Sequence, residues 1–353
     1  MTTLTYDSHK TVNYPPLQLS KLHWFDKENL AKDTPIIDVK KLNTEEELKK
    51  LIQDAQENKF FYIDNHEIEE ALIEALLNEQ RKFFSLPEEE KMKFSPSETK
   101  NDVGGYMGFG ATSVAKISGR GQAADQLIKY IFSTYKNDFS YPNKIFEKAC
   151  KIYSEKLREL ARFILDKMFT ALALVEPGFK YTDTIKEDFI NKGFVQNMEV
   201  LYPAVKQDKD ATERMATHFD TSLITLLYQI PALGEASDKP YIGFEVEENG
   251  KRIPVAPLRG TFLMNFGELI HHLTGGGIPA TYHGVKRPSD EQLISSERMS
   301  IVGFYFPDPQ AKIKQTSLKG SMSYNAIKNG YIKEGIEIAQ QDLRKAMFKD
   351  YAY

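Results

Sequence analysis

Apolar residues in the first half of the chain recur at helical spacing. Asn43 followed by Glu46 is a helix-start signature, and apolar side chains return every three or four residues behind it. A second amphipathic stretch begins at Ile68 and stops near Pro87, and residues 143–175 are long enough for one continuous helix. The buried stripe of this long helix is expected at Ile145, Ala149, Ile152, Leu160, Ile164 and Met168. The first half of the chain is therefore predicted to be rich in helix.

Short β-prone runs follow one another after residue 190. They read FVQNMEVLYP, HFDTSLITLLYQ, YIGFEVEENGKRIPVAP, GTFLMNFG, ATYHGVKRP and RMSIVGFYFP. Turn residues separate them, and several short strands at such spacing are typical of a β-sandwich or barrel. From about residue 321 the pattern returns to helix, whereas the glycine-rich residues 103–121 lack periodicity and are expected to form loop and irregular strand.

These patterns predict an α+β chain in which helices flank one β core. The sequence contains no internal repeat, and we expect a single domain over residues 1–353. Its expected parts are an α-rich N-terminal region at 1–190, the β core at 191–310 and a C-terminal helical segment at 311–353.

Composition places the chain among globular proteins, with 41% hydrophobic and 27% charged residues. The 50 acidic and 46 basic residues leave a net charge of −4, too small to indicate nucleic acid or an anionic membrane as partner. A single cysteine, Cys150, excludes an internal disulfide and a cysteine-built zinc site. The first residues lack the apolar core of a signal peptide, and no apolar run approaches membrane-spanning length. A cytoplasmic protein without nucleic-acid or membrane partners is therefore expected.

Candidate chemistry begins at His218-Phe219-Asp220. Residues two apart in a strand point to the same side, so the imidazole and the carboxylate can grip one face of a divalent metal. His283 lies in a second predicted strand, and two histidines with one carboxylate are the ligand set of non-haem iron(II) oxygenases. A zinc hydrolase uses the same ligands, and a surface histidine beside a turn aspartate fits the H-x-D pair alone. These alternatives stay open at this point.

An anion site is predicted at Arg298-Met299-Ser300. Arg298 and Ser300 share a strand face, where a guanidinium and a hydroxyl can hold a carboxylate. The same face continues through the apolar residues Val302, Phe304 and Phe306. Burying an unpaired arginine costs several kcal/mol, so an inward Arg298 needs an anionic partner. The alternative is an exposed arginine at the start of the strand, paired with Glu297.

The order H-x-D, then H, then R-x-S resembles the 2-oxoglutarate-dependent dioxygenases related to isopenicillin N synthase. Further stretches resemble that family in the same order: PIIDV, KFFYIDNHEI, RKFFSLPEEEKMKF, GYMGFG, LYP, GFEV, GTFLMNFGELIHHLTGG, TYHGV and RMSIVGFYFPDP. The resemblance runs from about residue 35 to 310, and the ordered series is more specific than any one motif. It departs at Val200, where the family often has asparagine, and near Arg252, where it usually has tryptophan.

The resemblance implies a double-stranded β-helix (jelly-roll) core with iron near its open end. It implies metal ligation by His218, Asp220 and His283, and binding of the distal carboxylate of 2-oxoglutarate by Arg298, Ser300 and Tyr202. It also places the substrate between the mouth of the β-helix and the N-terminal loops, with Tyr106, Phe109 and Phe304 as candidate walls.

The implied activity is oxidative decarboxylation of 2-oxoglutarate with Fe(II) and O2, coupled to hydroxylation or a related oxidation of a small molecule. One alternative is an iron oxidase of the same fold that does not use 2-oxoglutarate, in which Arg298 and Ser300 hold a substrate carboxylate. Two others are a metal hydrolase and a non-catalytic small-molecule-binding protein.

Overall fold

The computed structural model describes residues 14–29, 34–101, 104–135, 139–204, 213–234, 240–248, 250–314 and 318–349. The first 13 residues, in which no signal-peptide core was found, lie outside these ranges, as does Val103. No helix within the described ranges combines the length and apolar character needed to cross a membrane.

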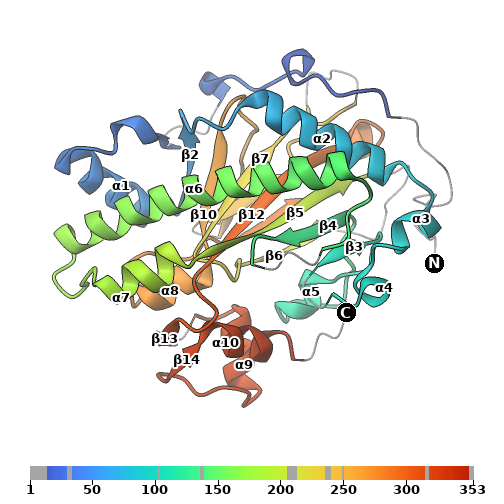
Figure 1. The fold of residues 1–353 in the computed structure, drawn as a ribbon. Helices are drawn as coiled ribbons and strands as arrows, with labels where there is room; N and C mark the ends of the chain where they lie inside the picture. Colours follow the sequence, from blue (N-terminus) through green and yellow to red (C-terminus); the bar gives the residue numbers. More distant parts are fainter. Residues whose placement is uncertain are drawn as a thin grey trace.

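Strands lie at the centre of the molecule and helices around them (Figure 1). The strands are β1 (Ile36–Asp38), β2 (Phe60–Asp64), β3 (Gly105–Met107), β4 (Ile128–Ser133), β5 (Phe194–Tyr202), β6 (Glu213–His218), β7 (Ile224–Gln229), β8 (Phe244–Glu248), β9 (Lys251–Pro254), β10 (Phe262–Phe266), β11 (His283–Lys286), β12 (Arg298–Phe306), β13 (Lys312–Lys314) and β14 (Glu337–Ala339). The helices are α1 (Glu45–Asn58), α2 (Glu70–Phe84), α3 (Glu88–Met92), α4 (Pro96–Thr99), α5 (Val114–Ile117), α6 (Lys144–Val175), α7 (Asp183–Ile185), α8 (Glu268–Leu273), α9 (Met322–Lys328) and α10 (Gln340–Met347). Short 3-10 turns lie at Leu19–Lys21, Lys27–Asn29, Val39–Lys41 and Asp290–Gln292, and a π-helical turn lies at Lys186–Asn191.

Two sheets form the centre of the molecule. The larger has the order β1-β2-β10-β7-β12-β5-β4-β3 and the smaller the order β6-β11-β8-β9. All pairs are antiparallel except β1 with β2. An apolar cluster joins the inner faces of both sheets, with Val200, Leu227 and Val302 from the larger and Phe244 and Val285 from the smaller. The sheets therefore pack face to face around one interior.

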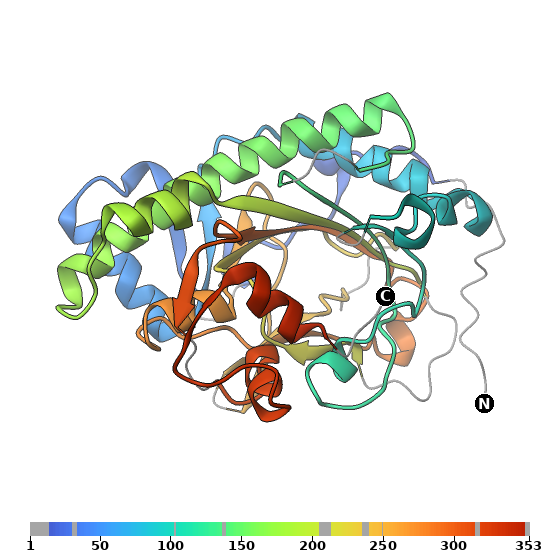
Figure 2. The ribbon, with the colours of Figure 1, turned by 60° about the horizontal axis from the view of Figure 1, so that its bottom comes forward.

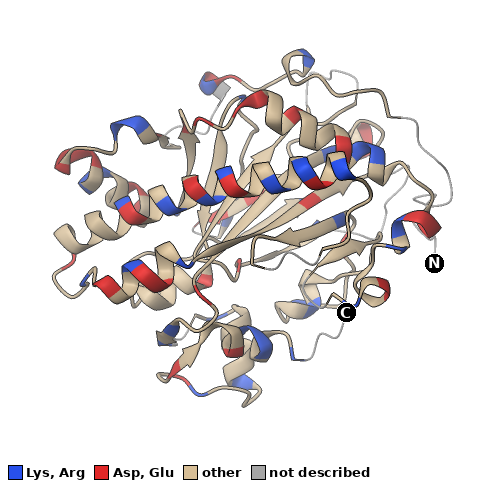
Figure 3. Cartoon of the chain, viewed as in Figure 1, with Lys and Arg blue, Asp and Glu red and all other residues tan. Residues whose placement is uncertain are grey.

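Strand alternation separates this interior from the helical layer. On β12, Met299, Ile301 and Tyr305 join the main core, whereas Arg298, Ser300 and the even-numbered residues after them face the cavity between the sheets. The long helix α6 covers the outer face of the large sheet together with α1 and α2 (Figure 1). Lys, Arg, Asp and Glu alternate along the solvent side of α6 (Figure 3), which is typical of an amphipathic covering helix.

Several predictions about single elements are confirmed and others are wrong. The helix predicted over 143–175 is α6, but Ile145 is 68% exposed and Ile152 is 41% exposed, so both lie off the buried stripe. The other predicted positions, Ala149, Leu160, Ile164 and Met168, are buried, and the stripe also includes Phe146, Cys150, Tyr153 and Leu157. Helix α1 begins after Thr44, whose hydroxyl accepts a hydrogen bond from the Glu47 N–H, one residue later than the Asn43 signature indicated.

Strands also occur outside the predicted β core, and those at β1 and β2 agree with the β-prone runs at residues 35–39 and 59–63. Strands β1 to β4 lie within residues 1–190 yet complete the large sheet, so the β core extends beyond 191–310. In the C-terminal segment, β13 pairs with β14 beside α9 and α10. Figure 2 brings this segment forward and shows it next to the short helix α5. The Asn325 side chain of α9 donates to the carbonyl of Ile117 in α5 across a distance of 3.3 Å, which ties the two together.

Candidate metal centre

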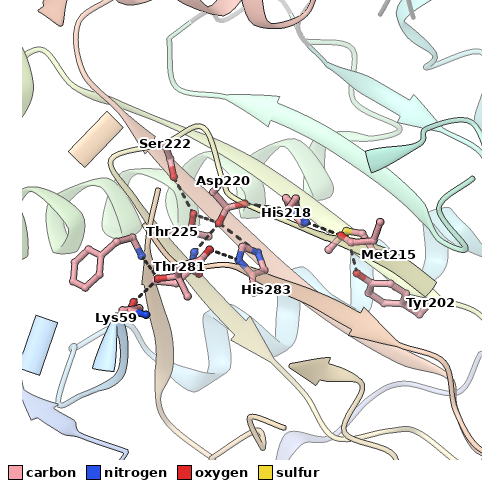
Figure 4. Close-up of polar contacts among 12 residues, drawn as sticks. Lys59, Tyr202, Met215, His218, Asp220, Ser222, Thr225, Thr281 and His283 are labelled. Atoms are coloured by element: carbon pink, nitrogen blue, oxygen red, sulfur yellow. Dashed lines mark hydrogen bonds and ion pairs between the residues drawn. The ribbon is translucent and has the colours of Figure 1, made fainter. Parts of the chain in front are cut away.

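Three buried ligands converge where β6 and β11 pair. His218 is the last residue of β6 and His283 the first of β11, and the two are directly opposite in the register. Asp220 lies beyond the end of β6, so the prediction that it shares a strand with His218 is wrong. Its side chain nevertheless reaches both rings, and one ligand atom from each residue lies within 4.8 Å of the others (Figure 4). Within the described ranges, no other group of three histidine, cysteine or acidic residues meets this geometry.

Backbone carbonyls orient both imidazoles. Nδ1 of His218 is 2.9 Å from the carbonyl oxygen of Ala216, and Nδ1 of His283 is 3.1 Å from that of Thr281 (Figure 4). A ring that donates its Nδ1–H to a carbonyl presents the lone pair of Nε2, which is the form that binds metal. The two Nε2 atoms each lie 3.6 Å from an oxygen of Asp220. The three side chains therefore fit a divalent ion between them.

Side chains that were not predicted hold the carboxylate in place. The Oδ2 atom of Asp220 accepts hydrogen bonds of 2.7 Å from the Thr225 hydroxyl and the Asn265 amide. Burial alone would raise the pKa of Asp220, but the facing imidazoles of His283 and His218 hold it below its usual range. Asp220 is therefore charged, as a metal ligand must be.

A buried guanidinium lies in the same cavity. Arg298 is 2% exposed, so the alternative of an exposed arginine paired with Glu297 is wrong. Its Nη2 donates to the Gln229 side-chain oxygen at 3.1 Å, while its Nη1 has no hydrogen-bond partner among the described residues. Ser300 is buried on the same strand face, and Tyr202 is paired with Arg298 across β5 and β12. A buried N–H without a partner fits an incoming carboxylate.

A second arginine, Arg214, was missed by the sequence analysis. The guanidinium carbons of Arg214 and Arg298 each lie 5.3 Å from the centre of the Tyr202 ring. Arg214 is fully buried and donates to the backbone carbonyls of Gln126, Pro203 and Ser296. Arg214 lies four residues before His218 and therefore on the same face of the strand, and this spacing is the sequence feature that could have indicated it. Arg214 does not line the cavity, but its charge behind Tyr202 adds to that of Arg298 and favours an anion at this end.

The cavity between the sheets has a volume of about 1120 Å³ including its open mouth, and it connects the metal ligands with Arg298, Ser300 and Tyr202. Phe304 lies on its wall as predicted, but Tyr106 and Phe109 do not. The Tyr106 hydroxyl donates to the Glu88 carboxylate at 2.9 Å, and its ring packs 5.6 Å from that of Phe83 in the core. Sequence reasoning missed the wall residues Lys129, Gln196, Met322, Arg344 and Phe348.

Comparison with known proteins identifies the chain. Residues 190–307 match the model of the 2OG-Fe(II) oxygenase superfamily, and residues 34–147 match that of the non-haem dioxygenase in morphine synthesis N-terminal region. An α-ketoglutarate-dependent kainoid synthase of Pseudo-nitzschia multiseries is 31% identical over 302 residues, covering 84% of this chain and 78% of the relative. The chain belongs to the 2-oxoglutarate/Fe(II)-dependent oxygenase superfamily. A second kainoid synthase, from Digenea simplex, is 32% identical over 300 residues, 84% of this chain and 81% of its own.

Solved structures of oxygenases share the fold. A full-length Neurospora crassa protein in complex with α-ketoglutarate, another name for 2-oxoglutarate, superimposes with a TM-score of 0.66 at 21% identity over 92% of this chain and 98% of the Neurospora chain. The rice dioxygenase for auxin oxidation gives 0.64 at 17% identity, with 90% and 96% covered. The predicted double-stranded β-helix is therefore confirmed.

Membership of this oxygenase superfamily establishes the class of reaction. The protein is an oxidoreductase that uses Fe(II), 2-oxoglutarate and O2 to oxidise a small-molecule substrate, as predicted. This favours the predicted activity over the three alternatives: a metal hydrolase, a non-catalytic binding protein and an iron oxidase that does not use 2-oxoglutarate.

Proposed function

We propose that His218, Asp220 and His283 hold the iron and that Arg298, Ser300 and Tyr202 bind the distal carboxylate of 2-oxoglutarate. The observation that carries this assignment is one shared cavity, with three ligand atoms within 4.8 Å of one another and a buried arginine with an unpaired N–H. Two neutral imidazoles and one carboxylate leave a divalent ion with positive charge, which an anionic co-substrate balances.

Iron(II), 2-oxoglutarate and dioxygen together supply the oxidation of a substrate C–H bond coupled to decarboxylation of the co-substrate. The residues of this chain bind the metal and the co-substrate and position them. Asp220 and the two histidines would hold the metal, and this ligand set would leave coordination positions for the co-substrate and dioxygen. Arg298, held by Gln229, fixes the far end of the co-substrate. The apolar strand faces around them exclude water from the reacting atoms.

The substrate is proposed from the relatives. Two of them carry the name kainoid synthase, so small molecules of that kind are the first class to test. We also propose that the whole chain acts as a single oxygenase domain. A cytoplasmic location and the absence of nucleic-acid and membrane partners stay predictions from the sequence.

The test is optical and needs no substrate. Anaerobic addition of Fe(II) and 2-oxoglutarate is expected to produce a weak visible charge-transfer band, and Asp220→Ala or His283→Ala abolishes it because a ligand is lost. His271→Ala is the matched control, since His271 is half-buried on α8 and does not line the cavity. Absence of the band in the unaltered protein, or its survival in both ligand variants, would overturn the assignment.

A further inference from the structure

Lys129 points into the cavity that contains the proposed metal site. It lies on β4, where Ile128, Tyr130 and Phe132 join the main core and the alternate residues Lys129 and Ile131 line the cavity. Lysine is among the residues least often buried without a partner, yet Lys129 is only 9% exposed. This placement calls for an explanation from the residues around it.

None of the described residues offers the ammonium group of Lys129 a hydrogen bond or an ion pair. Burial lowers the pKa of Lys129, and the charge of Asp125 partly opposes this effect. Both oxygens of Asp125 are already used, one by the Thr112 hydroxyl at 2.7 Å and the other by the Val114 N–H at 3.0 Å. Burying most of a lysine without a protein partner for its ammonium group is unfavourable, so packing gives no reason for a lysine here.

The rest of the cavity wall favours an anion. Asp220, the proposed metal ligand, is the one acidic side chain among its described lining residues. Besides Lys129 and Arg298, a third cation lines the cavity: Arg344 of α10, which donates to the Gln196 side-chain oxygen at 2.7 Å and lies 5.1 Å from the centre of the Phe306 ring. The remaining wall is mainly apolar, with Ile117, Ile131, Met198, Val302, Phe304 and Phe348. A ligand that matches this wall has an apolar body and a negatively charged group.

The register separates Lys129 from the proposed co-substrate site. Lys129 is paired with Val200 of β5, and Val200 with Ser300 of β12. Two strand spacings, about 10 Å, therefore lie between the backbones of Lys129 and Ser300. Arg298, Ser300 and Tyr202 are proposed to bind the distal carboxylate of 2-oxoglutarate, so a second carboxylate is the better partner for Lys129.

We propose that Lys129 binds a carboxylate of the substrate, and hence that the enzyme oxidises an organic acid with an apolar body. This inference rests on the proposed function, because it takes the cavity to be the active site. A carboxylate there gives Lys129 its missing partner at the moment of binding, and it fixes which part of the apolar body faces the metal ligands.

The test measures binding to the full chain loaded with Mn(II) and 2-oxoglutarate, since Mn(II) allows titration without turnover. The probes are N-octanoylglycine and its methyl ester, which differ in the charged group alone. Calorimetric titration of the wild type is expected to give a dissociation constant at least about tenfold lower for the acid. In Lys129→Met this preference falls to within about twofold, while Lys129→Arg retains it because the charge remains. Lys251→Met, at an exposed lysine on β9, is the matched control and keeps the wild-type preference.

Each other result overturns the proposal. Equal affinity for acid and ester in the wild type, no binding of the acid, or an unchanged preference in Lys129→Met would each exclude a carboxylate site at Lys129. If Lys129→Met instead weakens the binding of 2-oxoglutarate about tenfold, Lys129 binds a carboxylate of the co-substrate and the proposal is wrong. If Mn(II) and 2-oxoglutarate do not bind the wild type, the proposed function itself fails. Thermal melting in the same buffer checks folding, and Lys129→Met is expected to melt no lower than the wild type because it removes a buried charge.

Discussion

His283 lies directly opposite His218 in the pairing of β11 with β6, and the centres of the two rings are 4.6 Å apart. Each ring is oriented by the carbonyl two residues earlier in the chain, Ala216 for His218 and Thr281 for His283. The same local device therefore repeats on two neighbouring strands. Because strand pairing fixes the distance and the carbonyls fix the rings, two of the three proposed ligands are arranged before any metal binds.

The third ligand depends on side chains from other strands, which makes Asn265 a sensitive position. We expect Asn265→Ala to raise the dissociation constant for Mn(II) by about 10- to 100-fold, because Asp220 keeps only the Thr225 hydroxyl to orient its Oδ2 atom. Electron paramagnetic resonance of free Mn(II) measures this directly. Asn191→Ala, at a surface asparagine bonded to Glu187, is the control. A change of less than about twofold would mean that Asp220 is held without Asn265.

Substitution of Arg298 tests the proposed co-substrate site. Lysine keeps the charge but loses the planar fork of donors. Arg298→Lys is therefore expected to raise the dissociation constant of 2-oxoglutarate by about 10- to 100-fold. Titration of the visible band of the Fe(II) complex gives the dissociation constant. Arg287→Lys, at a surface pair with Asp290, should leave it unchanged. Unaltered affinity in Arg298→Lys would mean that the distal carboxylate of 2-oxoglutarate binds elsewhere.

The sequence predicted features that follow from local periodicity and from the ordered motifs. Strand parity on β12 placed Arg298, Ser300 and Phe304 on one face, and the structure puts all three on the cavity wall. The convergence of His218 with His283 followed from the motif order, because pairing between β6 and β11 is non-local and no periodicity reveals it.

Local sequence patterns could not predict the features that depend on long-range packing. Tyr106 was predicted on the cavity wall because its loop was expected to face the substrate, but Glu88 and Phe83 hold it in the core. Lys129 is the one charged residue of β4, a run too uniformly apolar to show alternation, and its neighbours depend on how β4 joins β5. Helix α10 supplies Arg344 from far along the chain, and nothing local indicates that contact.

The structural role of Tyr106 leads to its own prediction. Tyr106→Phe removes the hydrogen bond to Glu88 and is expected to lower the free energy of unfolding by about 0.5–1.5 kcal/mol. Turnover of 2-oxoglutarate should stay at the wild-type rate, because the ring lies outside the cavity. Urea denaturation and succinate release measure the two effects. If Tyr106→Phe had wild-type stability but altered turnover, Tyr106 would act in the substrate pocket and not in the core.

A buried carboxyl ties the C-terminal segment to the edge of the cavity. Glu268, the first residue of α8, accepts hydrogen bonds from the backbone N–H groups of Met322 at 2.7 Å and Ser323 at 3.1 Å. Met322 in turn lines the cavity. Burial raises the pKa of Glu268 to about 7 despite these donors.

The raised pKa of Glu268 gives a pH dependence with a definite sign. Between the ordinary value of 4.5 and the folded value of about 7, the folded state keeps a proton that the unfolded state has lost. Stability from this group is therefore complete below pH 4.5 and is lost as the pH rises through about 7. In urea denaturation of chelator-treated protein, wild-type stability relative to Glu268→Gln should fall by up to about 3 kcal/mol over this range. Glu291→Gln, in the exposed turn at Asp290–Gln292, is the control and should parallel the wild type. A constant difference between wild type and Glu268→Gln would show that Glu268 titrates alike in both states.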